Sequence, residues 1–231
     1  MITCVVPVFN DERTIAGVLD VATSVAAIDE VLAVDDGSRD GSARVLAGYR
    51  HPKCRVLSHP RNRGKAAAVV TGIEAARGDV IMVCDADLRS LRPHHLTALI
   101  ERFAAGDAGM VIAAREGADG WFDRLNARLA GERIFRKRDV EPFCAFAPTL
   151  GHGWEQLLNY IYRHQKIVTV VSRDIGHFEK FRRYPFPLWL FRYVTQYHQF
   201  PLATLRIALV LRRRSLLASV RRLSIGRFSS A

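Results

Sequence analysis

The most informative stretch of this chain is Gly78-Asp79-Val80-Ile81-Met82-Val83-Cys84-Asp85-Ala86-Asp87. A short apolar run ends there in two aspartates, and alternate residues of an extended chain point the same way. Paired carboxylate oxygens suit Mg²⁺ or Mn²⁺. Because open α/β sheets bind ligands beyond the carboxyl ends of their strands, the stretch predicts a buried strand with a metal and diphosphate site at its end.

Short apolar runs alternate with amphipathic segments on either side of this strand. The predicted strands are Ile2 to Val8, Glu30 to Asp35, Arg55 to Ser58, Val80 to Cys84, Met110 to Ala114 and Ile167 to Val171. The predicted helices begin near Ile15, Ala43, Lys65, Pro93 and Trp154. This alternation predicts an α/β fold with a mainly parallel sheet flanked by helices. The rhythm breaks from Arg115 to Pro148, where we expect irregular structure.

The positive charge of the chain is concentrated at its C-terminal end. Residues 181–231 hold ten arginines and no acidic residue, whereas the first 180 residues hold 24 basic and 23 acidic groups. We therefore predict one domain over residues 1–180 and a basic amphipathic helical tail over 181–231. Arginines interrupt its apolar segments, so we expect the tail to lie on an anionic membrane, to extend into solvent or to contact another subunit, and not to span a bilayer.

The cysteines and the N-terminus predict a cytoplasmic protein. Cys4, Cys54, Cys84 and Cys144 lie far apart and form no Cys-x-x-Cys pair, which is typical of buried thiols in a reducing compartment. The chain also enters a predicted strand within two residues, so we expect no secretion signal.

Two common nucleotide-binding folds do not fit the loops. A dinucleotide site needs glycines after the first strand, but this chain has Phe9-Asn10-Asp11-Glu12, whose carboxylates would repel a pyrophosphate. Gly64-Lys65 matches the end of a phosphate-binding loop, yet His59 replaces the first glycine of that motif and Ala66 its hydroxyl residue.

A different set of motifs does match, in order, over residues 2–115. It comprises Val6-Pro7-Val8-Phe9-Asn10-Asp11-Glu12, Val34-Asp35-Asp36-Gly37-Ser38-Arg39-Asp40-Gly41-Ser42, Asn62-Arg63-Gly64-Lys65-Ala66 and Asp85-Ala86-Asp87. Together they resemble the GT-A glycosyltransferases of family 2. Ala130-Gly131-Glu132-Arg133 and Gly151-His152-Gly153-Trp154-Glu155 resemble acceptor-side segments of the dolichyl-phosphate sugar synthase branch and of related glucosyl-phosphoglycerate-type enzymes. The resemblance implies the GT-A fold and a nucleoside diphosphate sugar donor, such as a UDP- or GDP-sugar.

The resemblance also implies roles for residues on the donor side. Asp36 would accept hydrogen bonds from the base or ribose, or would only shape its turn. Pro7, Phe9 and Glu12 would line the nucleoside pocket, although Phe9 could pack on the core and Glu12 could be an ordinary acid of the first helical turn. Lys65 would meet the diphosphate at a helix N-terminus, or would be a solvated lysine.

A divalent metal, Mg²⁺ or Mn²⁺, is implied on the same side. Asp87 would hold the metal, and Asp85 would contact it, a metal-bound water or the ribose. His177 would be a third ligand, although a lone histidine can equally be structural. The metal would neutralise the charge that develops on the departing diphosphate.

The acceptor side carries a carboxylate and a group of cations. Glu155 would be the general base for a hydroxyl acceptor, or would orient Arg133 or a substrate hydroxyl, whereas a lipid phosphate needs no base. Arg133, Arg136, Lys137 and Arg138 place four cations in six residues, which suits a phosphate-bearing acceptor but also a solvated basic loop.

The leading hypothesis is metal-dependent sugar transfer to a phosphorylated acceptor, a polyprenyl phosphate, by a protein peripheral to the cytoplasmic face of the membrane. Transfer to a soluble acceptor, such as a phosphoglycerate or a glycan hydroxyl, is the alternative, with the tail as an oligomer contact. Nucleic-acid binding is disfavoured because no recognition motif accompanies the basic tail. An inactive nucleotide-binding relative is a further alternative.

Overall fold

The computed structural model describes residues 1–115, 130–150, 153–172 and 176–177. Its main element is a seven-stranded sheet of order β3-β2-β1-β4-β7-β6-β8. The strands are β1 (Ile2–Val8), β2 (Glu30–Asp35), β3 (Cys54–Ser58), β4 (Val80–Val83), β6 (Met110–Arg115), β7 (Arg133–Arg136) and β8 (Ile167–Ser172). All pairings are parallel except those of β7, which is antiparallel to β4 and β6. The mainly parallel sheet is therefore confirmed.

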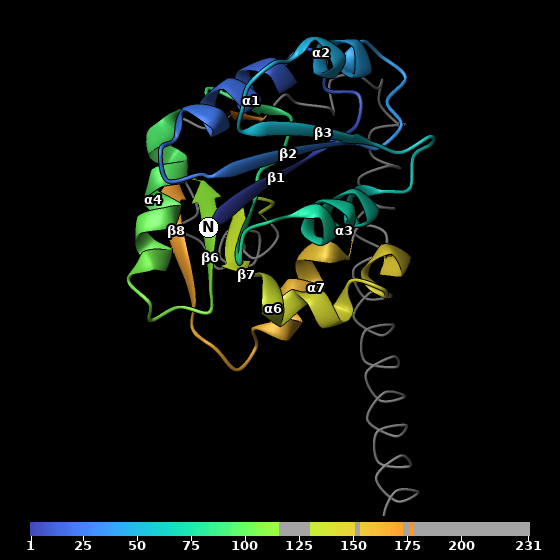
Figure 1. The fold of residues 1–231 in the computed structure, drawn as a ribbon. Coiled ribbons are helices and arrows are strands. Elements are labelled where there is room, and N and C mark those ends of the chain that lie inside the picture. The colour runs from blue at the N-terminus through green and yellow to red at the C-terminus, as the bar shows by residue number, and fades with distance from the viewer. Residues whose placement is uncertain (116–129, 151–152, 173–175, 178–231) are drawn as a thin grey trace, which may run out of the picture.

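Helices cover both faces of the sheet, as predicted (Figure 1). One face carries α1 (Ile15–Ser24), α2 (Ser42–Gly48) and α4 (Pro93–Ala104); the other carries α3 (Lys65–Ala75), α6 (Lys137–Val140) and α7 (Trp154–Ile161). Two short 3-10 helices, η1 (Glu141–Phe143) and η2 (Ala147–Leu150), lie between α6 and α7 in the chain. A small antiparallel pair, β5 (Leu88–Arg89) with β9 (Gly176–His177), stands apart from the main sheet.

The central strands are apolar at successive positions because both of their faces are buried. On β1, Cys4 packs into the core beneath α1 and α4, while Val5 packs into the core beneath α3 and α7. Met82 and Ile81 of β4 divide between the same two cores. Each such side chain is fully buried, which contributes about 1.5–3 kcal/mol for a residue of this size.

Small residues bring α3 close to the sheet. Gly72 faces Val5 so closely that a Cβ atom would overlap with the valine side chain. The helix begins after Gly64, whose φ of 92° is a conformation that favours glycine. Lys65 therefore lies in the first turn of α3, at the carboxyl edge of the sheet.

The stretch from Arg115 to Pro148 was expected to be irregular, and this expectation is wrong for its described part. β7 lies in the middle of the sheet, where Ile134 pairs with Met82 and Phe135 with Ile81. Both of these β7 side chains are fully buried. The strand is only four residues long and begins and ends with arginine, so its apolar run is too short to be recognised.

The predicted basic tail, residues 181–231, lies outside the described residues, as does the boundary predicted at residue 180. In the part of the chain that the structure does describe, no helix is both long enough and apolar enough to cross a bilayer.

Candidate functional site

The carboxyl ends of β1, β2 and β4 meet at one edge of the sheet. β1 lies between the other two, with Val8 opposite Asp35 and Val5 opposite Val83. The loops that begin with Phe9, Asp36 and Cys84 therefore start side by side. This is the edge at which open α/β sheets bind ligands.

The first loop is tied to the second through Asn10. Its side-chain oxygen accepts a hydrogen bond from the Arg39 amide at 2.8 Å, and its own amide donates to the Ser38 hydroxyl at 3.0 Å. Asn10 has a φ of 59°, which asparagine tolerates better than most residues. Pro7 is buried inside β1, whereas Phe9 is 36% exposed at its end. Of the two apolar residues predicted to line the nucleoside pocket, only Phe9 offers open surface.

Glu12 strengthens the same connection between the loops. Its carboxylate accepts a hydrogen bond from the Gly41 amide at 2.6 Å, and its own amide donates to Asp40. Asp40 also accepts hydrogen bonds from the amide and hydroxyl of Ser42. Burial raises the pKa of Asp40, but these donors outweigh it and the pKa is lowered. Glu12 therefore has a structural partner, and its predicted contact with a nucleoside remains a prediction.

Asp36 is buried and accepts three hydrogen bonds from the segment that precedes α3. The donors are the amides of Arg63 at 2.9 Å and Gly64 at 2.7 Å, and Nδ1 of His59 at 2.7 Å. Gly37, with a φ of 69°, leaves room for the backbone of Arg61, which a Cβ atom would meet at 2.5 Å. The carboxylate therefore orders the segment before α3 and not only its own Asp-Gly turn, and its contact with a base or ribose stays a prediction.

His59 was not recognised as part of the site from the sequence. Its Nε2 lies 2.9 Å from the hydroxyl of Thr71 in α3, so the ring connects Asp36 to this helix. Its position immediately after the third predicted strand could have drawn attention to it, because buried histidines need polar partners.

Lys65 connects Asp85, which is predicted to lie on the donor side, with Glu155, which is predicted to lie on the acceptor side. Its ammonium lies 2.8 Å from Oδ1 of Asp85 and 2.9 Å from Oε1 of Glu155. Burial lowers the pKa of this lysine, but the two carboxylates outweigh burial and raise the pKa above its ordinary value. Lys65 is therefore a paired cation, and the interpretation as a solvated lysine is wrong.

Glu155 lies in the first turn of α7, and its side chain is only 11% exposed. Burial raises its pKa, but the charges of Lys65 and Arg133 outweigh this effect and lower it. The residue is thus held as a carboxylate, and a carboxylate with a lowered pKa is a weak general base.

Arg133 is fully buried. Its guanidinium donates to the carbonyl of Ala130 at 2.7 Å, to the side chain of Asn159 at 2.9 Å and to the carbonyl of Glu155 at 3.4 Å. Burial is the main reason that its pKa is lowered to about 10. Its predicted role toward an acceptor phosphate does not fit this burial, whereas the alternative contact with Glu155 does.

The other three predicted acceptor cations point to different places. Arg136 stacks over the ring of Phe103, and Lys137 donates to the carbonyl of Ala76 at 2.8 Å. Arg138 is exposed and lies 3.8 Å from Asp139. Along β4, Arg133 pairs at one end, with Val83, and Arg136 at the other, with Val80. The prediction that these four cations form one phosphate site is therefore wrong.

Asp85 and Asp87 follow β4 at the same edge, and both side chains are partly exposed. The backbone of His177 pairs with that of Leu88, so this predicted ligand is close to Asp87 in the fold, although its side chain lies outside the description. Among the described side chains, no group of three His, Cys, Asp or Glu residues could hold a metal. The assignment of a divalent cation to Asp85, Asp87 and His177 therefore stays a prediction, and Asp85 is paired with Lys65 in this structure.

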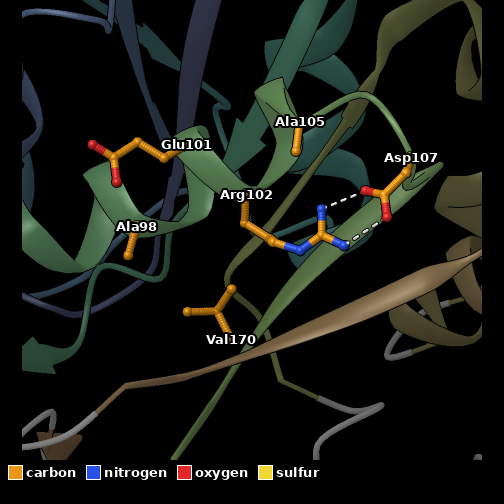
Figure 2. A pocket seen from close by; sticks show the side chains of 6 residues that line it. All are labelled: Ala98, Glu101, Arg102, Ala105, Asp107 and Val170. Carbon is orange, nitrogen blue, oxygen red and sulfur yellow. Dashed lines mark hydrogen bonds and ion pairs between the residues drawn. The ribbon is translucent and has the colours of Figure 1, made fainter.

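A separate depression lies between α4 and β8 (Figure 2). Arg102 and Asp107 form an ion pair beside it, and Val170 contributes from β8. None of the residues predicted for the site lines this depression.

The fold and the acidic end of β4 define an α/β protein of the GT-A type. More specifically, the chain belongs to glycosyl transferase family 2, whose sequence profile matches residues 3–147. This confirms the resemblance on which the residue assignments depend.

Several relatives and solved structures are similar to this chain. An undecaprenyl-phosphate 4-deoxy-4-formamido-L-arabinose transferase of Aeromonas hydrophila is 31% identical over 149 residues, which are 61% of this chain and 45% of the relative. A dolichyl-phosphate beta-glucosyltransferase of Trichomonas vaginalis is 37% identical over 98 residues, 37% of this chain and 28% of that relative. The chain thus spans less than half the length of these curated relatives.

A structural neighbour supports the same fold. Glucosyl-3-phosphoglycerate synthase from Mycobacterium tuberculosis, solved with Mn²⁺, UDP-glucose and phosphoglyceric acid, superposes with a TM-score of 0.68. The match covers 90% of this chain and 79% of that structure at 22% sequence identity.

Proposed function

We propose that the chain transfers a sugar from a nucleoside diphosphate sugar to a polyprenyl phosphate, with a divalent metal as cofactor. The observation that carries this proposal is the contact of Lys65 with both Asp85 and Glu155, at the sheet edge beside the Phe9 and Asp36 loops. Relatives named for undecaprenyl phosphate and dolichyl phosphate support the acceptor class.

The donor would bind along the ends of β1, β2 and β4. The exposed Phe9 ring would contact the base, and the Asp36 loop would close the nucleoside end of the site. Asp87, with Asp85 and His177, would hold Mg²⁺ or Mn²⁺, which when bound neutralises the charge of the leaving diphosphate. Lys65 would add a cation next to that charge, and the backbone amides that begin α3 would favour the same anion.

The state of Glu155 favours an acceptor that is already anionic. A hydroxyl nucleophile needs a base whose pKa lies near the working pH, but the pKa of Glu155 is lowered despite its burial. A phosphate oxygen attacks the anomeric carbon without losing a proton. Glu155 would then act by holding Lys65 in place, and it would not need to accept a proton.

The basic tail would place the protein at the inner face of the membrane. Residues 181–231 carry ten arginines, and a cation near an anionic leaflet contributes about 1 kcal/mol. Flotation of the full chain with vesicles of anionic or zwitterionic lipid tests this location. Binding that requires anionic lipid supports it, whereas a chain that stays unbound and self-associates supports the oligomer alternative.

The function is tested in two stages with the full chain and Mn²⁺. Thermal-shift measurements with UDP-, GDP- and dTDP-sugars identify the donor, because a ligand that binds only the folded state raises its stability. The labelled donor is then supplied with either undecaprenyl phosphate or 3-phosphoglycerate. We expect a lipid-linked product. A product formed only with 3-phosphoglycerate would replace this proposal by the soluble-acceptor alternative.

A further inference from the structure

The centre of the site holds two cations, Lys65 and Arg133, and three carboxylates, those of Asp85, Glu132 and Glu155. Lys65 lies within 2.9 Å of both Asp85 and Glu155, and the buried Arg133 attracts Glu155, Glu132 and Asp85. The side chains of Lys65, Asp85 and Glu155 are 27%, 19% and 11% exposed. Charges that are shielded from water to this extent interact more strongly than surface charges.

The carboxylate of Asp85 is also confined. Gly131 lies against it, and a Cβ atom at Gly131 would overlap with the carboxylate. With Gly131 packed on it and Lys65 hydrogen-bonded to it, the carboxylate has little freedom to turn toward another cation. The positive charge next to this carboxylate is that of Lys65.

We propose that Lys65 is a resident counter-ion that keeps a divalent cation off Asp85 until a donor diphosphate is present. This inference rests on the proposed function, because it assumes that Asp85 belongs to a metal-diphosphate site. A divalent cation on Asp85 would lie next to the ammonium, and like charges at such a distance repel. A diphosphate supplies oxygens both to the ammonium and to the metal, so donor and metal bind together. Lys65 is thus a positioning residue that makes metal binding depend on the donor.

The test measures Mn²⁺ binding to the full chain without nucleotide, by the EPR signal of free Mn²⁺. We expect Lys65→Met to bind Mn²⁺ at least about tenfold more tightly than the unchanged chain, because two adjacent carboxylates lose their counter-ion. The double variant Lys65→Met/Asp85→Asn should lose this gain, and Lys65→Arg, which keeps the charge, should show none. An unchanged affinity in Lys65→Met, or a gain that survives Asp85→Asn, would overturn the proposal.

A second variant keeps the test decisive if Lys65→Met does not fold. Asp85→Asn retains Lys65, and we expect its Mn²⁺ affinity without nucleotide to stay within about twofold of the unchanged chain. A loss of about tenfold or more would mean that Asp85 holds the metal beside Lys65, and would overturn the proposal.

The inference and the proposed function can fail separately. If Lys65→Met gains Mn²⁺ affinity but the unchanged chain transfers no sugar, the role of Lys65 as a counter-ion is supported and the proposed function is contradicted. Sugar transfer by the unchanged chain, without any such gain in the variant, supports the function and overturns the counter-ion.

Discussion

Gly131 lies directly against the carboxylate of Asp85, so closely that a Cβ atom would overlap with both of its oxygens. The contact joins the segment that leads into β7 to the end of β4, the antiparallel neighbour of β7 in the sheet. It explains why a residue without a side chain occurs at this point of the sequence.

Replacing Gly131 by alanine should displace Asp85 and weaken donor binding. We expect Gly131→Ala to lower the affinity for the donor nucleotide with Mn²⁺ by about tenfold or more, measured by isothermal titration calorimetry. Gly17→Ala is the matched control, because a Cβ atom on Gly17 of α1 meets nothing within 4 Å. The control should bind normally and be unchanged or slightly stabilised. Equal binding by the two variants would contradict the role given to Gly131.

Asp36 should contribute to stability because it organises the segment before α3. Its carboxylate accepts hydrogen bonds from two backbone amides and one ring nitrogen. Asp36→Ala should therefore lower the free energy of unfolding in urea by about 2–4 kcal/mol. His59→Ala, which removes one of these partners, should show a smaller loss, about 1–2 kcal/mol. If Asp36→Ala kept full stability and lost only nucleotide binding, the carboxylate would serve the base or ribose instead.

The two arginines at the ends of the basic stretch should behave oppositely. Arg133→Met removes the hydrogen bonds to the Asn159 side chain and the Glu155 carbonyl and a buried charge that Glu155 balances, so it should destabilise the fold by about 3–5 kcal/mol in denaturant unfolding. Arg138 is exposed, so Arg138→Ala should change stability by less than about 0.5 kcal/mol. It should also leave the KM for the acceptor unchanged, and a clear rise in that KM would restore Arg138 to the acceptor site.

Acid should destabilise the protein partly through Glu30, which lies at the opposite edge of the sheet from the site. Burial raises the pKa of Glu30, but the Arg77 amide, Thr3 and Arg55 outweigh it and lower the pKa below its ordinary 4.5. Its stabilising contribution is therefore complete above about pH 5 and is lost as the pH falls through the lowered folded-state pKa. Glu30→Gln should be less stable at pH 7 and should lose less stability on acidification. Parallel pH profiles of unfolding for the two proteins would contradict this assignment.

The sequence predicts the sheet well where local pattern and burial agree. The β4 run and its two aspartates are apparent because an apolar stretch ends in charge, and the Ala-rich start of α3 follows from helix propensity. β7 escapes prediction because its four residues are buried by pairing with distant strands, which no local pattern records. The sheet order and the antiparallel direction of β7 also depend on tertiary structure, so the local sequence pattern does not predict them.

The sequence predicts which residues belong to the candidate site better than it predicts which of them contact one another. Lys65, Asp85 and Glu155 were each singled out, but the lysine and the glutamate are 90 residues apart and no spacing indicates that they form an ion pair. Four cations in six residues predict a phosphate-binding role for Arg133, and only its place on a central strand explains its burial. In the sequence, His59 stands out only because it replaces the first glycine of a phosphate-binding loop. Its contacts with Asp36 and Thr71 are formed by the fold.

The most direct test of the central claim is the transfer of labelled sugar to undecaprenyl phosphate. The full chain is incubated with the labelled donor, the lipid phosphate and Mn²⁺, and label is measured in the organic phase with and without chelator. We expect label to enter the lipid only with the divalent metal, and to fall at least about a hundredfold in Asp87→Asn. Label that remains in the aqueous phase with every donor, or lipid labelling that is undiminished in Asp87→Asn, would contradict the account.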